Sequence, residues 1–396
     1  MLFSQAKELI SSSRLHSSKS QQSQHRLYVY RLSSGSLGPK KVLESKVSSR
    51  FVEAAVRESE GRMIRIGVIG YGYWGPNIVR NFHTHESAEV LRVCDKSAKC
   101  ADRLRKAFPW IPFCTDDREI LESTHIDMVA VVTPVWTHYQ IAKRALLNGK
   151  HVFVEKPFTC SVDQAEELIE IAEKHKLKIM VDHTFLFTGA VKKIKELVDR
   201  KELGDLYYYD SLRVNLGLFQ HDVNVIWDLA PHDLSIMDHV IAARPETVIA
   251  TGETHLNGVE DVAFITVYFP KRIIAHINVN WLSPVKVRTT LIGGEKKMLV
   301  WNDLEVDEKI KIYDKGVSMS AHPSNLHELL VSYRSGDMHS PQLEQVEALR
   351  TETGYFLQCI ENNKTPFNDG VAGLRVVRIL EAADKSIRNR GQAVKL

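Results

Sequence analysis

The chain has 396 residues, 44% of them hydrophobic and 26% charged, an ordinary composition for a globular protein of about two domains. No run approaches the roughly 18 consecutive apolar residues of a membrane span, so we expect no membrane insertion. The net charge of +3 is uneven: residues 1–62 hold 11 Lys/Arg and 5 Asp/Glu, against 41 and 44 in the rest, and this mildly acidic body argues against nucleic-acid binding.

Residues 1–62 are rich in Ser and show little apolar periodicity, so we expect a mostly disordered tail. Three explanations stay open for it. It is a targeting peptide, because its first part is Ser-rich and poor in acids; it is a solvated regulatory tail; or it is translated sequence upstream of a start at Met63, which stands directly before the first strong strand pattern.

The pattern changes at residue 63, where short β-branched runs begin to alternate with amphipathic stretches. We expect strands at 64–70, 89–94, 128–133, 151–154 and 178–181, and helices at 75–83, 97–107, 137–148 and 161–175. Strands that alternate with helices of 10–15 residues indicate βαβ units and a parallel sheet.

After about residue 205 the rhythm is different. We expect strands at 207–209, 248–250, 262–267, 273–277 and 287–292, and helices at 226–242, 344–362 and 370–389. No helix separates the strands from residue 248 onward, so this part predicts an open antiparallel sheet.

A glycine-rich turn follows the first strand and opens the first helix; it reads Gly70-Tyr71-Gly72-Tyr73-Trp74-Gly75. The first glycine permits a tight turn, the second lets the backbone approach a pyrophosphate, and the third lets helix and strand pack closely. The helix N-terminus offers free N–H groups to the phosphates.

Asp95, 20 residues after Gly75, suits a ribose diol and would repel a 2′-phosphate. NAD is therefore favoured over NADP, although Lys96 beside Asp95 weakens that inference.

Two further motifs carry candidate chemistry. Glu155-Lys156-Pro157 directly follows a predicted strand, and a lysine at the carboxyl end of a parallel strand points into the ligand crevice. Asp228 and His232 lie four residues apart and share a helix face, so the carboxylate can orient the imidazole. Taken singly, each motif is also compatible with ordinary surface residues.

Metal chemistry has no candidate site in the sequence. The five cysteines are scattered, with no CxxC pair and no cluster with His, which indicates reduced thiols in a cytoplasmic protein. His221-Asp222 and His175-Lys176 are interpreted as surface residues.

Together these motifs resemble the Gfo/Idh/MocA family of dehydrogenases across residues 63–396, in the order Gly70-x-Gly72-x-x-Gly75, Asp95, Thr133-Pro134 with His138, Glu155-Lys156-Pro157 and Asp228-x-x-x-His232. The resemblance implies an NAD-binding Rossmann domain at 63–183. It also implies a substrate-binding and oligomerisation domain at 184–396, built on a large, mostly antiparallel sheet, in a homodimer or homotetramer.

The resemblance also implies roles for individual residues. Lys156 would contact the nicotinamide ribose and the substrate hydroxyl, with Glu155 beside it. His232 would be the general base in alcohol oxidation, supported by Asp228. The group formed by Thr133, Pro134 and His138 would lie near the nicotinamide end.

The substrate is less narrowly defined. Residues 181–187 and 222–235 are similar to the nucleotide-sugar branch of that family, which includes UDP-N-acetylglucosamine 3-dehydrogenases, and this favours oxidation of a sugar C3 hydroxyl. A diphosphate needs cationic partners, and the candidates are Arg213, Arg288 and Arg334. An inositol or free-sugar dehydrogenase stays open, as does a non-catalytic module that holds NAD without turnover.

Overall fold

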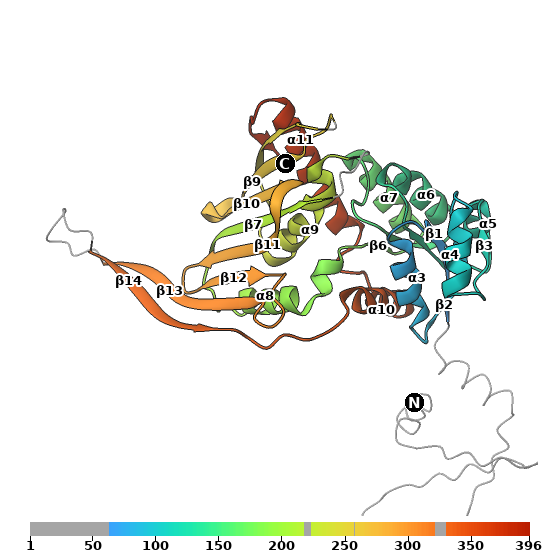
Figure 1. The fold of residues 1–396 in the computed structure, drawn as a ribbon, viewed down its shortest axis with the longest axis horizontal. Coiled ribbons are helices and arrows are strands. Elements are labelled where there is room, and N and C mark those ends of the chain that lie inside the picture. Colours follow the sequence, from blue (N-terminus) through green and yellow to red (C-terminus); the bar gives the residue numbers. More distant parts are fainter. Residues whose placement is uncertain (1–62, 218–222, 257, 321–329) are drawn as a thin grey trace, which may run out of the picture. The chain divides into compact units, whose positions relative to one another are not determined.

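Two β-sheets organise the part of the chain that the structure describes, residues 63–217, 223–256, 258–320 and 330–396 of a computed structural model. One sheet has six strands and the other nine (Figure 1). The tail predicted at 1–62 and the pair His221-Asp222 lie outside the described residues. The domain limits at residues 62 and 183 stay predictions.

The six-stranded sheet is entirely parallel and has the order β3-β2-β1-β4-β5-β6. Its strands are β1 (Ile64–Ile69), β2 (Ala88–Cys94), β3 (Phe113–Cys114), β4 (Met128–Val131), β5 (His151–Val154) and β6 (Ile179–Val181). Its helices are α3 (Gly75–His83), α4 (Lys99–Ala107), α5 (Arg118–Leu121), α6 (Val135–Leu147) and α7 (Val162–Lys174). The predicted Rossmann sheet is confirmed.

Strand β1 pairs with β2 on one side and with β4 on the other, so the strand order reverses between β1 and β4. Residues of β4 are buried on both faces because helices cover the sheet on either side. In such sheets the ligand crevice opens at the carboxyl ends of the strands next to the reversal. The loops after β1, β4 and β5 therefore meet at one edge.

The nine-stranded sheet has the order β14-β13-β12-β11-β7-β10-β9-β8-β15. Its strands are β7 (Leu206–Leu216), β8 (Thr247–Glu253), β9 (Val262–Tyr268), β10 (Ile274–Asn280), β11 (Leu282–Gly294), β12 (Met298–Asn302), β13 (Ile310–Ser320), β14 (Leu330–His339) and β15 (Val394–Lys395). Its pairs are antiparallel except β10 with β7, which run parallel. The predicted mostly antiparallel sheet is confirmed, with this one parallel exception to the open antiparallel arrangement.

Helices cover one face of the larger sheet. Along β9 the buried residues alternate with accessible ones, which is the period of a strand with one covered face. Helices α9 (Val225–Val240) and α11 (Gly370–Arg388) lie against each other and against β8 and β10. The connection from the Rossmann sheet contains the short helix η1 (Thr184–Phe187) and α8 (Gly189–Asp199), and η2 (Pro270–Arg272) joins β9 to β10.

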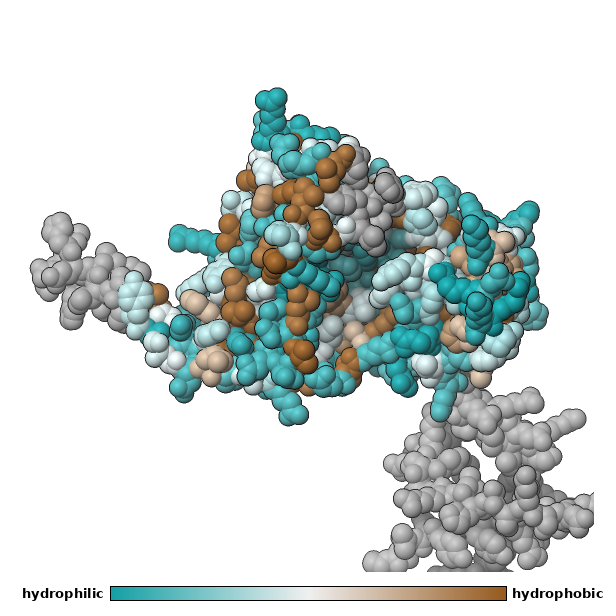
Figure 2. Space-filling view, viewed as in Figure 1, coloured by the Kyte–Doolittle hydropathy of each residue, from teal (hydrophilic) through white to brown (hydrophobic). Residues whose placement is uncertain are grey.

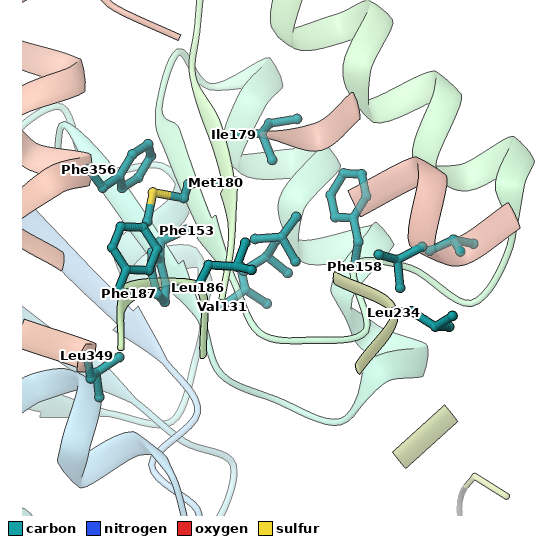
Figure 3. Packing of buried hydrophobic residues seen from close by; sticks show 14 of the residues in the cluster. Val131, Phe153, Phe158, Ile179, Met180, Leu186, Phe187, Leu234, Leu349 and Phe356 are labelled. Atoms are coloured by element: carbon teal, nitrogen blue, oxygen red, sulfur yellow. The ribbon is translucent and has the colours of Figure 1, made fainter. Parts of the chain in front are cut away.

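Helix α10 (Ala348–Glu361) returns the chain to the Rossmann sheet. Glu347, just before it, accepts hydrogen bonds from Arg80 and Asn81 of α3. Phe356 of α10 packs on Phe153 of β5, with ring centroids 6.1 Å apart. Figure 3 shows buried side chains from both parts of the chain meeting in this cluster. Among the described helices, none is long and apolar enough to cross a membrane.

The elements differ from the predictions in both halves of the chain. In the first half, β3 and α5 were not predicted. Strands β7 and β11 are much longer than predicted, and α8 and the strands from β12 onward were not predicted. Helix α10 begins at residue 348 rather than 344, and α4 begins at 99 rather than 97. The ends of these strands contain many polar residues, so the sequence shows no strong alternation of apolar and polar residues there. The length of each strand depends on the strand with which it pairs.

Candidate active site

The glycine-rich turn connects β1 to α3 and has the geometry of a phosphate cradle. Gly70 has φ +103°, and a Cβ there would meet the Val132 carbonyl oxygen at 2.2 Å. A Cβ on Gly75 would meet the Gly70 oxygen at 2.6 Å, whereas one on Gly72 would meet no protein atom within 4 Å. The turn is thus closed by protein at its two ends and open at its middle, where a pyrophosphate needs room.

The N-terminus of α3 carries no side-chain cap and is available to bind an anion. Trp74 at the N-cap makes no side-chain capping hydrogen bond, the first turn contains no acid, and Pro76 lacks an N–H. Unsatisfied N–H groups and the positive end of the helix dipole favour a phosphate at this position. The residues of this turn therefore fit the pyrophosphate of a dinucleotide.

Asp95 follows β2 and supports the glycine turn directly. Its carboxylate accepts hydrogen bonds from the backbone N–H groups of Tyr71, at 2.7 Å, and Ser97, at 2.8 Å. Arg103 of α4 reaches the carbonyl oxygen of Gly72 at 2.8 Å and lies over the Tyr71 ring. These hydrogen bonds fix the Asp95 carboxylate beside the glycine-rich turn, and its role in binding a ribose stays a prediction.

The aromatic residues of the turn separate into two environments. The Tyr71 side chain is fully buried, whereas Tyr73 is 90% exposed. The Trp74 indole N–H donates to Asp182 at 3.3 Å, just after β6. Only the backbone of Tyr71 can therefore line the cofactor cleft, while Trp74 joins the turn to the next segment of the site.

Thr133 and Pro134 lie between β4 and α6, and His138 lies in the first turns of α6. The His138 ring is buried, with Nδ1 2.9 Å from the Pro157 oxygen and Nε2 2.7 Å from the Thr133 oxygen. Burial lowers the pKa of His138 despite these two carbonyl groups. His138 can act on the site only by holding the Thr133 and Pro157 segments together.

Lys156 and Asp228 meet although 72 residues separate them. The Lys156 Nζ donates to the Asp228 carbonyl oxygen at 2.8 Å and lies 3.5 Å from the Oδ1 atom. The Lys156–Pro157 peptide bond is cis. Trp281, between β10 and β11, donates its indole N–H to the Asp228 Oδ2 at 3.1 Å. The carboxylate is therefore held from two sides.

His232 lies one helical turn after Asp228 on α9. Its Nδ1 atom is buried without a hydrogen-bond partner, and its ring meets Phe185 of η1 edge-on at 5.0 Å. Burial, followed by the charges of Lys156 and Arg213, holds the pKa of His232 well below its usual range. The imidazole is neutral at physiological pH and can accept a proton.

The three predicted diphosphate candidates are in different environments. Arg213 is 4% exposed and forms a buried ion pair with Asp233, with Nε and Oδ2 2.6 Å apart. Arg334 is exposed on the β13–β14 hairpin and pairs with Asp314. Arg288 of β11 is partly exposed, lies 3.6 Å from Asp303 and 5.8 Å from the centre of the Phe185 ring, and its charge helps to lower the pKa of His232. Of the three, Arg288 has the longest ion-pair distance to its carboxylate.

Carboxyl groups gather beneath Lys156. The buried Glu155 Oε1 has no hydrogen-bond partner, and burial and the neighbouring Asp182 raise the pKa of Glu155 well above its usual value. The same two causes raise the pKa of Glu352 of α10. Glu155 therefore lies behind the site as a neutral acid. No group of three or more His, Cys, Asp or Glu placed to hold a metal ion occurs in the described ranges.

Sequence reasoning did not identify Trp281, Phe185 or Asp182 as parts of this site. Phe185 and Asp182 lie within the 181–187 stretch that carried the resemblance, so that stretch was the available signal. Trp281 lies 53 residues beyond Asp228 and had no local signal. Only the fold brings it to the carboxylate.

Comparisons with known proteins match both parts of the fold. Residues 64–183 match the profile described as "Oxidoreductase family, NAD-binding Rossmann fold", and residues 191–300 match the "GFO/IDH/MocA C-terminal domain". A UDP-N-acetylglucosamine 3-dehydrogenase of Acidithiobacillus ferrooxidans is 26% identical over 79% of this chain and 94% of its own. A scyllo-inositol 2-dehydrogenase (NAD(+)) of Bacillus subtilis is 25% identical over 84% of this chain and 96% of its own.

A solved structure extends the comparison of the fold. Scyllo-inositol dehydrogenase from Lactobacillus casei, with bound NAD(H) and scyllo-inositol, superposes with a TM-score of 0.67 at 19% identity. The superposition covers 84% of this chain and 99% of that one. At this identity the likeness concerns the fold alone.

Proposed function

Because this chain belongs to the Gfo/Idh/MocA family of NAD-binding oxidoreductases, we propose that it oxidises a secondary hydroxyl of a sugar, and more narrowly the C3 hydroxyl of a nucleotide sugar. The observation that carries the proposal is the meeting of Lys156 with Asp228 and the helix of His232. This meeting lies at the carboxyl edge of the parallel sheet. A module that only stores NAD has no need for a base and a cation placed together there.

The residues present divide the chemistry between them. NAD, when bound, supplies the hydride acceptor. His232, neutral because of its low pKa, takes the proton of the substrate hydroxyl. The Lys156 ammonium stabilises the negative charge that develops on the hydroxyl oxygen. Asp228, fixed by Lys156 and Trp281, holds the ammonium in place.

Arg288 supports the nucleotide-sugar class over an inositol. Its guanidinium is partly buried and near Arg213, and burial and that neighbour lower the pKa of Arg288. Asp233 pairs closely with Arg213, whereas the charged partner of Arg288 is Asp303 at 3.6 Å, so Arg288 is the better placed of the two to pair with a diphosphate. The relative from Acidithiobacillus ferrooxidans is named for a nucleotide-sugar substrate and covers most of both chains.

The test is NAD reduction by the full chain with UDP-N-acetylglucosamine, free N-acetylglucosamine and scyllo-inositol. The proposal expects turnover with the first and a C3 ketone in the product, identified by NMR. Turnover restricted to scyllo-inositol would favour the inositol dehydrogenase. Tight NAD binding with no turnover on any of the three would favour a non-catalytic module.

We also propose a homodimer or homotetramer that forms through the open face of the nine-stranded sheet. The pair Tyr268 and Ile274 lies on that face, opposite the helices, and Phe264 is 40% exposed on it. Figure 2 shows hydrophobic residues gathered over this part of the sheet. Sedimentation analysis of the wild type and of Phe264→Lys tests the assembly, and a wild-type monomer contradicts it.

The scattered cysteines support a cytoplasmic enzyme.

A further inference from the structure

A small polar cavity lies beside α9. Its volume is about 140 Å³. Its polar lining residues are His183, Ser235, Asp238, His239, Arg244 and Arg375. This space has room for several waters, since a polar cavity needs only about 15 Å³ for one. It adjoins an open groove of about 970 Å³, with which it shares Leu186, His239 and Phe367. The cavity therefore has a route to bulk solvent.

One face of α9 joins this cavity to the proposed base. Asp228, His232, Ser235 and His239 follow the spacing of residues that share a helix face. Ser235 donates its hydroxyl to the His232 carbonyl oxygen at 2.8 Å and also lines the cavity. The cavity thus begins about one turn, roughly 5 Å, along the helix from His232.

The surroundings of His232 oppose retention of a proton. Its protonated ring would face the positive charges of Lys156, Arg213 and Arg288, while the Phe185 ring covers one edge. Substrate and cofactor exclude water from the cleft during the reaction. A proton taken up at His232 therefore needs an exit on the buried side, where Nδ1 has no hydrogen-bond partner.

His183 lies two residues after the end of β6. It is 3% exposed and lines the cavity, and it is near enough to His232 that a positive charge on it would lower the pKa of His232. Unlike His232, it faces two carboxylates, Asp182 and Asp238, together with one cation, Arg375. Among the described residues its ring forms no hydrogen bond. A proton that moves from His232 to His183 passes from cationic to partly anionic surroundings.

We propose that His183 is a proton relay, which carries the proton of the substrate hydroxyl from His232 to the water of this cavity. The inference rests on the proposed dehydrogenase function. The substrate O–H bond breaks with transfer of its proton to His232, and the C–H bond breaks with transfer of a hydride to NAD, so a C=O bond forms. The proton on His232 passes through one water to a His183 nitrogen, while the other His183 nitrogen releases its proton to the cavity.

The test compares wild type with His183→Ala in the full chain, with UDP-N-acetylglucosamine or scyllo-inositol, whichever the wild type oxidises. We expect kcat to fall by about tenfold or more, with KM for NAD and substrate little changed. The solvent deuterium isotope effect on kcat should rise, because proton exit becomes rate-limiting. Imidazole at constant ionic strength should restore part of the rate to the variant and leave wild type unaffected.

His151→Gln is the matched control. Burial lowers the pKa of His151 to about 4, the value that His183 also has, but His151 lies at the opposite end of β5 from Lys156. The control should keep the wild-type rate and isotope effect. A fall in kcat for His183→Ala without imidazole rescue and without a larger isotope effect would show a structural role and overturn the relay, as would an unchanged kcat. Absence of turnover in wild type would overturn the proposed function and the relay together.

Discussion

The Lys156 ammonium donates a hydrogen bond to the Asp228 carbonyl oxygen at 2.8 Å, which ties the loop after β5 to the helix that carries His232. One partner belongs to the parallel sheet and the other to the helix layer of the larger sheet. The contact therefore fixes the position of the proposed base relative to the proposed cofactor cleft. Chemistry at this site depends on the two sheets keeping this relationship.

Replacement of Lys156 tests its role directly. We expect Lys156→Ala to lower kcat/KM by about 100-fold or more, because a cation beside the reacting oxygen stabilises developing charge. The dissociation constant for NAD, measured by fluorescence titration, should change much less. Lys143→Met, which breaks a surface ion pair with Glu167, is the control and should keep full activity. Equal losses in both variants would contradict the assignment.

Arg288→Ala separates the substrate classes. A charge-assisted hydrogen bond contributes roughly 1.5–3 kcal/mol, so loss of a diphosphate contact should raise KM for UDP-N-acetylglucosamine by about tenfold or more. Any oxidation of scyllo-inositol should change little, because an uncharged substrate has no phosphate. Arg334→Ala, on the hairpin and paired with Asp314, is the matched control. If Arg288→Ala leaves the KM for the nucleotide sugar unchanged, Arg288 does not bind the diphosphate.

The sequence was sufficient for five of the six Rossmann strands and for the glycine turn, because these depend on local spacing, but it gave no signal for the two-residue strand β3. β-branched runs buried on both faces, glycines at fixed intervals and an acid after the second strand are all readable within 40 residues. Because Lys156 directly follows a parallel strand, the same local pattern also predicts that it lies at the carboxyl edge of the sheet, where the ligand crevice opens. These features needed no knowledge of distant contacts.

Distant contacts explain what could not be predicted. Trp281 reaches Asp228 only because β10 and β11 lie beside β7 in the larger sheet. Arg213 and Arg288 look alike in the sequence, yet Asp233 neutralises only the first. In β13, the alternation of Ile310 and Ile312 was a usable strand signal, but the polar residues that follow obscured its length.

The buried ion pair of Arg213 and Asp233 should matter more for folding than for binding. Ser211 also donates to the Asp233 carboxylate, at 2.7 Å. Asp233→Asn leaves the Arg213 charge buried without its counter-charge, so we expect the free energy of unfolding to fall by about 3–5 kcal/mol. Chemical denaturation of wild type and Asp233→Asn measures this difference in the free energy of unfolding. The double variant Arg213→Met with Asp233→Leu should recover much of the loss, and a double variant as unstable as the single one would contradict this account.

The stability of the protein should depend on pH through His183. Burial lowers the pKa of His183 to about 4 in the folded protein, below the unfolded value of roughly 6.5. The folded state therefore binds the proton less readily than the unfolded state. This contribution is fully present above about pH 6.5 and is lost as the pH falls toward 4, by about 3 kcal/mol in total.

Denaturation of wild type and His183→Gln at several pH values across this window should give two curves that converge as the pH falls. His125→Gln, at an exposed position, should follow wild type throughout. Parallel curves for wild type and His183→Gln would mean that His183 titrates alike in both states.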